Sequence, residues 1–292
     1  MSSNAAKTQM KIIAGAPLAL RLARAMSRSQ MRGAGVLMRL LNKLGVLNRI
    51  AQYEVGHAKF SVPLFRIPWD FCDVTNYERK FVELFCRALI PFQNALLFDC
   101  GADIGTFSSL VCSCSKNIAR IIAFEPNPEV REFLRSNLSN LPITHQLIPK
   151  AISDFEGVGK LQRPEDNLTD HARFLIPGDG PIEVTTIDSM NVRGGYIAIK
   201  LDIEGGELDA LKGATETIAA AQECVIAVEA HPSVARRIGR DPIETLRFLE
   251  SIRSFQFMVA ETGQYLSTLS PILYDRQTEI WNVVGWTHGM PL

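Results

Sequence analysis

Acidic and polar residues stand at the ends of several short apolar segments, and together they could build a ligand site. These residues are Asp99, Glu125, Asp154, Asp202, Glu204 and His231. Open α/β sheets bind their ligands at the carboxyl ends of the strands. If the apolar segments are neighbouring parallel strands, these side chains gather at one edge of a sheet and face a common ligand.

The segment that begins at Asp99 has the composition of a cofactor-binding turn. It reads DCGADIG, with Ala102 and Asp103 between the glycines Gly101 and Gly105. Glycine permits a tight turn and lets a ligand approach the backbone closely. A carboxylate at Asp99 that faces the turn suits a cationic amino group, whereas a pyrophosphate would prefer the opposite charge.

Glu125 lies about 20 residues after this turn, where an acid binds the ribose hydroxyls of an adenosine-containing cofactor. The alternative is an acid that ends a strand in solvent. The glycine turn upstream favours the ribose role.

Predicted strands and helices alternate from residue 76 onward. We expect strands over 95–100, 119–125, 143–152, 183–187, 196–202, 224–229, 255–260 and 280–286, and helices over 76–89, 106–115, 128–140, 207–220 and 242–253. Residues 154–181 are rich in glycine and proline, so we expect an irregular loop that contacts the substrate. The alternation indicates βαβ units and a mostly parallel sheet.

The N-terminal part of the chain differs from the rest in charge. Residues 1–53 carry nine basic residues and no acid, whereas the remainder carries 22 basic and 31 acidic residues. Apolar residues at helical spacing predict helices here, and residues 51–75 read as a connector. We therefore predict a basic helical arm with its connector over 1–70 and a catalytic domain over 71–292. The arm could bind an anionic membrane or a partner, but we favour a helical cap on the chain's own domain.

Composition excludes several classes of protein. The formal net charge is zero, so bulk charge predicts no nucleic-acid partner. The six cysteines form no C-x-x-C pair, and we interpret them as reduced thiols of a cytoplasmic protein. No run approaches the roughly 18–20 apolar residues of a membrane span, so any membrane contact would be peripheral. An organelle transit peptide remains an alternative for the arginine-rich N-terminus.

Six motifs together resemble the FkbM-type methyltransferases, which belong to the class I S-adenosylmethionine-dependent enzymes. The motifs are DCGADIG, AFEPNP, AISDFEG, TTIDS, KLDIEGGELDALKGA and VEAHP. The resemblance covers roughly residues 70–290, and Lys200–Ala214 is its most specific stretch. One departure is Asp103, where the family usually has Asn; Asp keeps the acceptor oxygen but loses the amide donor.

The resemblance implies a Rossmann-like, doubly wound, seven-stranded and mostly parallel sheet with an antiparallel last strand, in addition to the helical arm. It also implies that the cofactor is S-adenosylmethionine. Gly101 and its neighbours would hold the methionine part, and Glu125 the ribose. Asp154 would contact the adenine amino group, although a turn-capping role for Asp154 is an equal alternative.

The resemblance implies methyl transfer, most simply to a hydroxyl of a small metabolite, sugar or glycolipid. Such a nucleophile loses its proton during attack, so a base must lie within hydrogen-bond reach. We expect Asp202, Glu204 or His231 in this role. Paired carboxylates can also bind a metal, but no third ligand is fixed and we predict none. The alternatives are an NAD-dependent oxidoreductase, disfavoured because G-x-G-x-x-G is missing, and a non-catalytic membrane-docked module.

Overall fold

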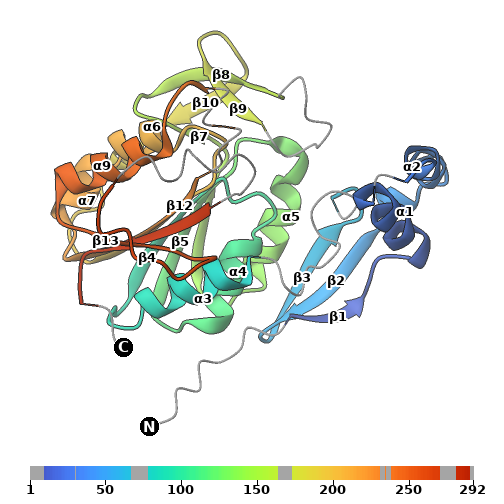
Figure 1. Ribbon diagram of the computed structural model, residues 1–292, viewed down its shortest axis with the longest axis horizontal. Coiled ribbons are helices and arrows are strands. Elements are labelled where there is room, and N and C mark those ends of the chain that lie inside the picture. Colours follow the sequence, from blue (N-terminus) through green and yellow to red (C-terminus); the bar gives the residue numbers. More distant parts are fainter. Residues whose placement is uncertain are drawn as a thin grey trace.

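A seven-stranded sheet forms the centre of the molecule in a computed structural model of the chain (Figure 1). The structure describes residues 10–29, 31–66, 78–163, 173–230, 234, 238–269 and 281–289. The strand order is β13-β14-β12-β11-β4-β5-β6. Their bounds are β4 (Ala95–Cys100), β5 (Ile118–Phe124), β6 (Thr144–Ile148), β11 (Tyr196–Leu201), β12 (Glu223–Ala230), β13 (Gln256–Val259) and β14 (Trp281–Trp286).

The sheet is parallel except at β14, which runs antiparallel to both β12 and β13. The predicted mostly parallel sheet with an antiparallel last strand is therefore confirmed. Strands β4, β5 and β6 follow one another toward one edge of the sheet. The next strand of this sheet, β11, lies on the other side of β4. This reversal is the switch point at which sheets of this kind bind their ligands.

Helices cover both faces of the sheet, as a doubly wound fold requires (Figure 1). On one face, α3 (Arg79–Ala88), α4 (Thr106–Cys114) and α5 (Pro128–Ser139) share a core with Leu97 and Ile121. On the other face, α6 (Glu207–Lys212), α7 (Thr215–Ala220) and α9 (Pro242–Ile252) share a second core with Phe98 and Ile199. Strands that are buried on both faces read as continuous apolar runs, which explains why the sequence identified them.

Two predicted elements are divided in the structure. The helix expected over 207–220 is split into α6 and α7 at Gly213, where a Cβ atom would lie 2.2 Å from the carbonyl oxygen of Ser153. The strand expected over 143–152 is split into β6 and β7 (Ala151–Ile152). Only β6 belongs to the large sheet.

The segment predicted to be irregular contributes to a second sheet, so that prediction was wrong. This sheet has the order β7-β10-β8-β9, with β8 (Gly157–Gln162), β9 (Phe174–Pro177) and β10 (Ile182–Thr185). A Cβ atom at Gly159 would lie 2.6 Å from the carbonyl oxygen of Ile176. Glycine in these strands therefore marks close contact between backbones rather than a loop.

The N-terminal region contains the predicted helices and also strands that were not predicted. The helices are α1 (Leu18–Arg28) and α2 (Ala34–Lys43). The strands β1 (Met10–Ala14), β2 (Ile50–Val55) and β3 (Ala58–Pro63) form a three-stranded antiparallel sheet. The expectation of a helical arm followed by a connector is therefore corrected, because the region also holds a sheet. The period-two burial of β2 and β3 is the signal of half-buried strands.

The N-terminal sheet is hydrogen-bonded to α5. Asn137 donates to the Ser61 carbonyl at 2.9 Å and accepts from the Ser61 N–H at 2.8 Å, and Asn140 donates to the Lys59 carbonyl at 2.9 Å. The boundary predicted near residue 70 lies outside the described residues and stays a prediction.

Cys86 and Cys114 are joined by a disulfide between α3 and α4, which corrects the expectation that every cysteine is reduced. The two helices lie against each other, so residues far apart in sequence come into reach of one another. Cys100, Cys112 and Cys224 are free thiols. Within the described ranges, the helices are all too short or too polar to cross a bilayer.

Candidate active site

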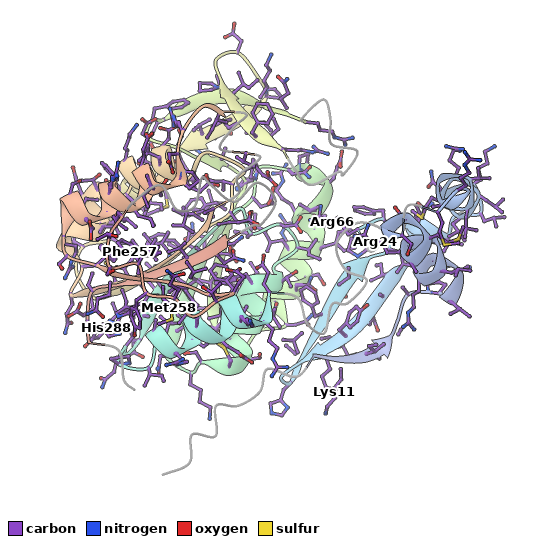
Figure 2. All side chains as sticks on the ribbon, viewed as in Figure 1. Lys11, Arg24, Arg66, Phe257, Met258 and His288 are labelled. Atoms are coloured by element: carbon purple, nitrogen blue, oxygen red, sulfur yellow. A yellow bond between two sulfur atoms is a disulfide. The ribbon has the colours of Figure 1, made fainter. Side chains whose placement is uncertain are left out.

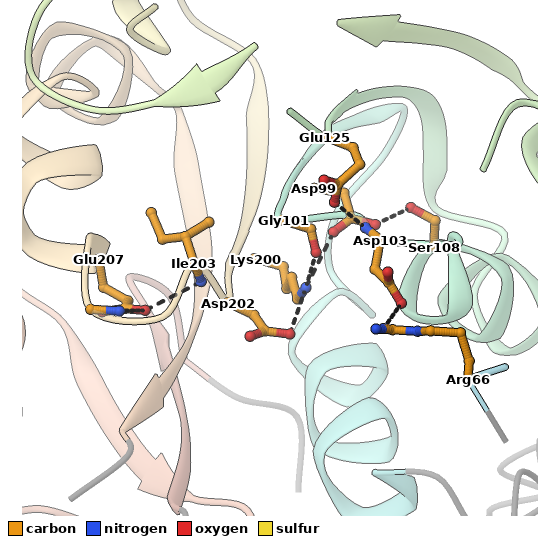
Figure 3. Close-up of polar contacts among 11 residues, drawn as sticks. Arg66, Asp99, Gly101, Asp103, Ser108, Glu125, Lys200, Asp202, Ile203 and Glu207 are labelled. Carbon is orange, nitrogen blue, oxygen red and sulfur yellow. Dashed lines mark hydrogen bonds and ion pairs between the residues drawn. The ribbon is translucent and has the colours of Figure 1, made fainter. Parts of the chain in front are cut away.

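Three predicted acids, Asp99, Glu125 and Asp202, gather at the carboxyl ends of β4, β5 and β11 (Figure 3). Asp99 is the last residue but one of β4, Glu125 follows β5, and Asp202 follows β11. Glu229, which was not among the predicted site residues, is the last residue but one of β12. Parallel pairing of these strands aligns their ends at one edge. The structure therefore brings the predicted Asp99, Glu125 and Asp202 together at one edge of the sheet, and the roles expected of them stay predictions.

The glycine turn brings the ends of two strands together. Gly101 has φ +76°, and a Cβ atom there would lie 2.0 Å from the carbonyl oxygen of Asp202. The close approach that this glycine permits is therefore one between backbones, whereas the sequence suggested a ligand. Gly105, at φ +85°, precedes the first residue of α4, and a Cβ atom there would lie 3.0 Å from Leu134.

Lys200 is the central cation of the site. Its Nζ donates to the Gly101 carbonyl at 2.9 Å and lies 3.1 Å from Asp202 Oδ2 and 3.6 Å from Asp99 Oδ1. It also lies 5.8 Å from the centre of the Phe107 ring. Burial lowers the pKa of Lys200, but the charges of Asp202 and Asp99 raise it by more, so the ammonium stays charged.

Asp99 is fully buried beneath the glycine turn. Its Oδ2 accepts a hydrogen bond of 2.5 Å from the Ser108 hydroxyl at the start of α4. Burial raises the pKa of Asp99, while Lys200 and Ser108 act in the opposite direction. The Oδ1 atom accepts no hydrogen bond from the described residues and so has capacity for a further donor.

Asp103 is held between two partners. Its N–H donates to Glu125 Oε2 at 2.8 Å, and its carboxylate is paired with the guanidinium of Arg66. The backbone of Asp103 has φ +50°, a conformation that Asn and Asp tolerate better than most residues. Arg66 is 5% exposed and comes from the N-terminal region, so it was not among the predicted site residues. In place of the amide donor that Asn would have supplied, this site has an ion pair.

Glu125 is buried and held by backbone donors on both sides. It accepts from the N–H of Asp103 and, at 2.7 Å, from the N–H of Asn127. Burial and the charge of Asp103 raise the pKa of Glu125 to about 7, although both backbone bonds and Arg66 oppose this rise. Each carboxylate oxygen can still accept another hydrogen bond.

A second group of acids surrounds Asp202. Glu229 is hydrogen-bonded to Asp202, and burial followed by the charges of Asp202 and Glu78 raises the pKa of Glu229 well above its ordinary value. Burial and the charge of Asp202 also raise the pKa of Glu78 to about 8. Glu78 is the residue before α3; the sequence placed it within the helix expected over 76–89, and it was not among the predicted site residues.

Beside this acid group lies an open cleft. Its charged lining residues are Glu204, Glu207, Glu229, Arg240 and Asp241. Three of them are held by contacts at the ends of helices or in turns, or by an ion pair. Glu207 accepts from the N–H groups of Ile203 and Gly205, Asp241 accepts from the N–H of Ile243, and Arg240 is paired with Asp209 at 2.7 Å.

Glu204 and Glu229 therefore supply the cleft carboxylates nearest to the strand ends. Glu204 has φ +58° and lies in the turn between β11 and α6.

Two further predicted site residues are Asp154 and His231. Asp154 is exposed after β7, and its Oδ1 accepts a hydrogen bond of 3.4 Å from the neighbouring Ser153 hydroxyl. His231 lies outside the described residues, directly after β12, so its role stays a prediction. In the part of the chain that the structure describes, no group of three or more His, Cys, Asp or Glu residues is arranged to hold a metal ion.

Comparison with known proteins gives the family. The model of the methyltransferase FkbM domain matches residues 99–257, which is more than half of the chain. The chain is 26% identical over 209 residues to the hexuronic acid methyltransferase AglP of Haloferax volcanii, covering 70% of this chain and 80% of that protein.

Two solved structures are similar at lower identity. TYW2 of M. jannaschii in complex with AdoMet has 14% identity and a TM-score of 0.42, covering 81% of this chain and 84% of that one. A methyltransferase from Clostridium acetobutylicum, described as S-adenosylmethionine-dependent, has 9% identity and a TM-score of 0.43, covering 76% and 96%. The family match, the strand order and the acids at the strand ends agree: the chain belongs to the FkbM methyltransferase family and uses S-adenosylmethionine.

Proposed function

We propose that the chain methylates a hydroxyl oxygen of a neutral sugar. The observation that carries this proposal is the cleft beside Asp202, whose lining includes the carboxylates of Glu204 and Glu229 next to the strand ends. Carboxylates accept hydrogen bonds from hydroxyl groups and repel other carboxylates. Arg240, the cation of the cleft lining, is already paired with Asp209.

The residues at the glycine turn fit the cofactor. Asp99 Oδ1 is a buried acceptor without a hydrogen bond from the described residues, beside a turn where the amino group of the methionine part would lie. Glu125 is fixed at the end of the neighbouring strand with acceptor capacity for the ribose hydroxyls. Asp154, at the exposed end of β7, would contact the adenine amino group. S-adenosylmethionine supplies a methyl group already activated on a sulfonium.

The carboxylates of this chain would orient the reactants and take up the proton of the attacking hydroxyl. The ion pair with Lys200 holds the Asp202 carboxylate in place, so Asp202 would orient the cofactor at the carboxyl edge of the sheet. Glu204 lines the cleft and would take the proton of the attacking hydroxyl. Glu229, with its raised pKa, would hold a proton toward Asp202 and reduce the repulsion between the two acids. His231 follows the same strand and is the alternative base.

The relative from Haloferax volcanii favours a carbohydrate acceptor, because its name assigns it a hexuronic acid. The acidic cleft of the present chain argues for a different member of that class. A hexuronate brings a carboxylate toward Glu204 and Glu229, whereas a neutral sugar brings donors.

Labelled S-adenosylmethionine, offered with neutral glycosides or with hexuronates, tests the proposal. We expect label in a base-stable methyl ether on a neutral sugar. Label in a base-labile methyl ester of a hexuronate, or on an amine, would contradict it. Glu204→Gln should lower turnover while leaving S-adenosylhomocysteine affinity unchanged. Wild-type turnover in that variant, together with lost turnover in His231→Ala, would move the base to His231.

A further inference from the structure

The large apolar side chains that the structure leaves exposed are concentrated in the N-terminal region. Twelve such residues are exposed among those described, and nine of them lie between residues 12 and 50. They are Ile12, Ile13, Leu18, Leu22, Met31, Val36, Leu40, Leu44 and Ile50. Single exposed apolar residues are ordinary, but a concentration in one small unit marks an interaction surface.

Helices α1 and α2 each carry two apolar faces. The inner face includes Leu20 and Leu41, which belong to the same buried cluster as Tyr53 of β2. The outer stripe, which we call the outer leucine stripe, consists of Leu18 and Leu22 on α1 and Val36, Leu40 and Leu44 at the α2 side. Residues four apart lie on the same side of a helix, so each stripe is continuous.

The two helices lie at the end of the molecule farthest from α7 and α9 (Figure 1). Figure 2 shows Lys11 and Arg24 on this same N-terminal unit, away from the body that carries the active site. The cap interpretation favoured from the sequence accounts for the inner face of the helices. It does not account for the outer leucine stripe.

Basic side chains border the outer leucine stripe. Arg21 lies on α1, and Arg39 and Lys43 lie on α2, each of them exposed. No acidic residue occurs in the sequence before Glu54. An isologous contact between two copies would bring like charges together, which disfavours a second copy of this surface as the occupant. Residues 1–50 also hold no aromatic side chain on which nucleic-acid bases could stack.

We propose that the outer leucine stripe and its basic border dock the protein on an anionic lipid bilayer. Apolar side chains of an interfacial helix enter the boundary between headgroups and acyl chains, and bordering Arg and Lys residues bind anionic headgroups. The helices lie on the surface and do not cross it, consistent with their lengths of 11 and 10 residues. This inference does not depend on which acceptor the active site methylates.

Vesicle sedimentation of the full chain tests the proposal. The probe is phosphatidylcholine vesicles with or without about a quarter phosphatidylserine. We expect binding to the anionic vesicles, weakened by salt. The double variant Leu22→Glu/Leu40→Glu should bind at least about tenfold more weakly, because it places charge where apolar groups must enter the bilayer.

Ile90→Glu is the matched control. Ile90 is 56% exposed, close to the 55% of Leu22 and the 51% of Leu40, but it lies in the methyltransferase body. The control should bind vesicles as the wild type does. Unchanged affinity for S-adenosylhomocysteine would show that all variants are folded.

Three results would overturn the proposal. The first is no binding of the wild type to anionic vesicles, and the second is equal binding by the double variant. The third is a stable dimer in analytical ultracentrifugation that the double variant dissociates, because the stripe would then be a contact between copies.

Discussion

Replacing Glu125 with glutamine should remove a pH dependence from cofactor binding. Burial and the charge of Asp103 raise the pKa of Glu125 to about 7, within the pH range of a binding measurement. The ribose hydroxyls would donate to the ionised carboxylate, so the ionised form is the one that binds well. Affinity should therefore rise as the pH rises through 7.

The size of the effect follows from the pKa. A carboxyl with a pKa of about 7 is roughly 9% ionised at pH 6 and roughly 91% ionised at pH 8. If only the ionised form binds tightly, the affinity for S-adenosylhomocysteine should be about tenfold higher at pH 8, or about 1.4 kcal/mol. Glu125→Gln should bind more weakly at pH 8 and lose this slope.

The same group should affect folding stability in the opposite direction. Its folded-state pKa is raised from 4.5, so the folded chain holds the proton more tightly than the unfolded chain between pH 4.5 and about 7. The stabilisation is fully present below pH 4.5 and is lost as the pH rises through 7. The difference corresponds to at most about 3 kcal/mol.

Titration calorimetry at pH 6, 7 and 8 and urea unfolding of the cofactor-free chain measure the two effects. Glu216→Gln is the control, because Glu216 is an exposed acid on α7 paired with Arg193. A wild-type affinity that is equal at pH 6 and pH 8 would refute the reasoning. A Glu125→Gln variant that keeps the wild-type slope would refute it equally.

Three further substitutions test other parts of the structure. Arg66→Met should destabilise the fold by about 1–3 kcal/mol in urea unfolding, because Asp103 loses its partner in a partly buried position; an unchanged midpoint would show that the pair contributes little. Gly101→Ala should abolish S-adenosylhomocysteine binding in calorimetry or prevent folding, because its Cβ would lie 2.0 Å from the Asp202 carbonyl at a positive φ; wild-type affinity would contradict the turn geometry. Asp188→Ala should lower stability by about 1 kcal/mol in thermal unfolding, because two backbone N–H groups at the start of α7 lose their acceptor, while cofactor affinity stays the same.

The large sheet could be predicted from the sequence because its strands are short apolar runs separated by helical patterns. The segments over 95–100 and 196–202 correspond to β4 and β11 within one residue, since buried parallel strands leave a local signal. The acids at strand ends were found for the same reason. Once the strands are placed, the parallel arrangement brings their ends together.

The second sheet and the N-terminal strands could not be placed from local pattern alone. In β8, Gly157 and Gly159 suggest a loop by composition, and only the partner strand shows why Gly159 is needed. The pairing of Cys86 with Cys114 depends on how α3 packs against α4, which spacing in the sequence does not encode. Arg66 is missed for the same reason, since its partner lies 37 residues later across two regions of the fold.

The ion pair between Arg66 and Asp103 has a consequence for how this protein can be recombined. Asp103 lies inside the segment that the FkbM family model matches, whereas Arg66 lies before its first residue, Asp99. Grafting the matched segment onto a foreign N-terminus would separate a carboxylate from its counter-ion at the edge of the cofactor turn. A chimera should therefore carry the two residues together, or restore asparagine at position 103 so that the turn no longer needs the missing arginine.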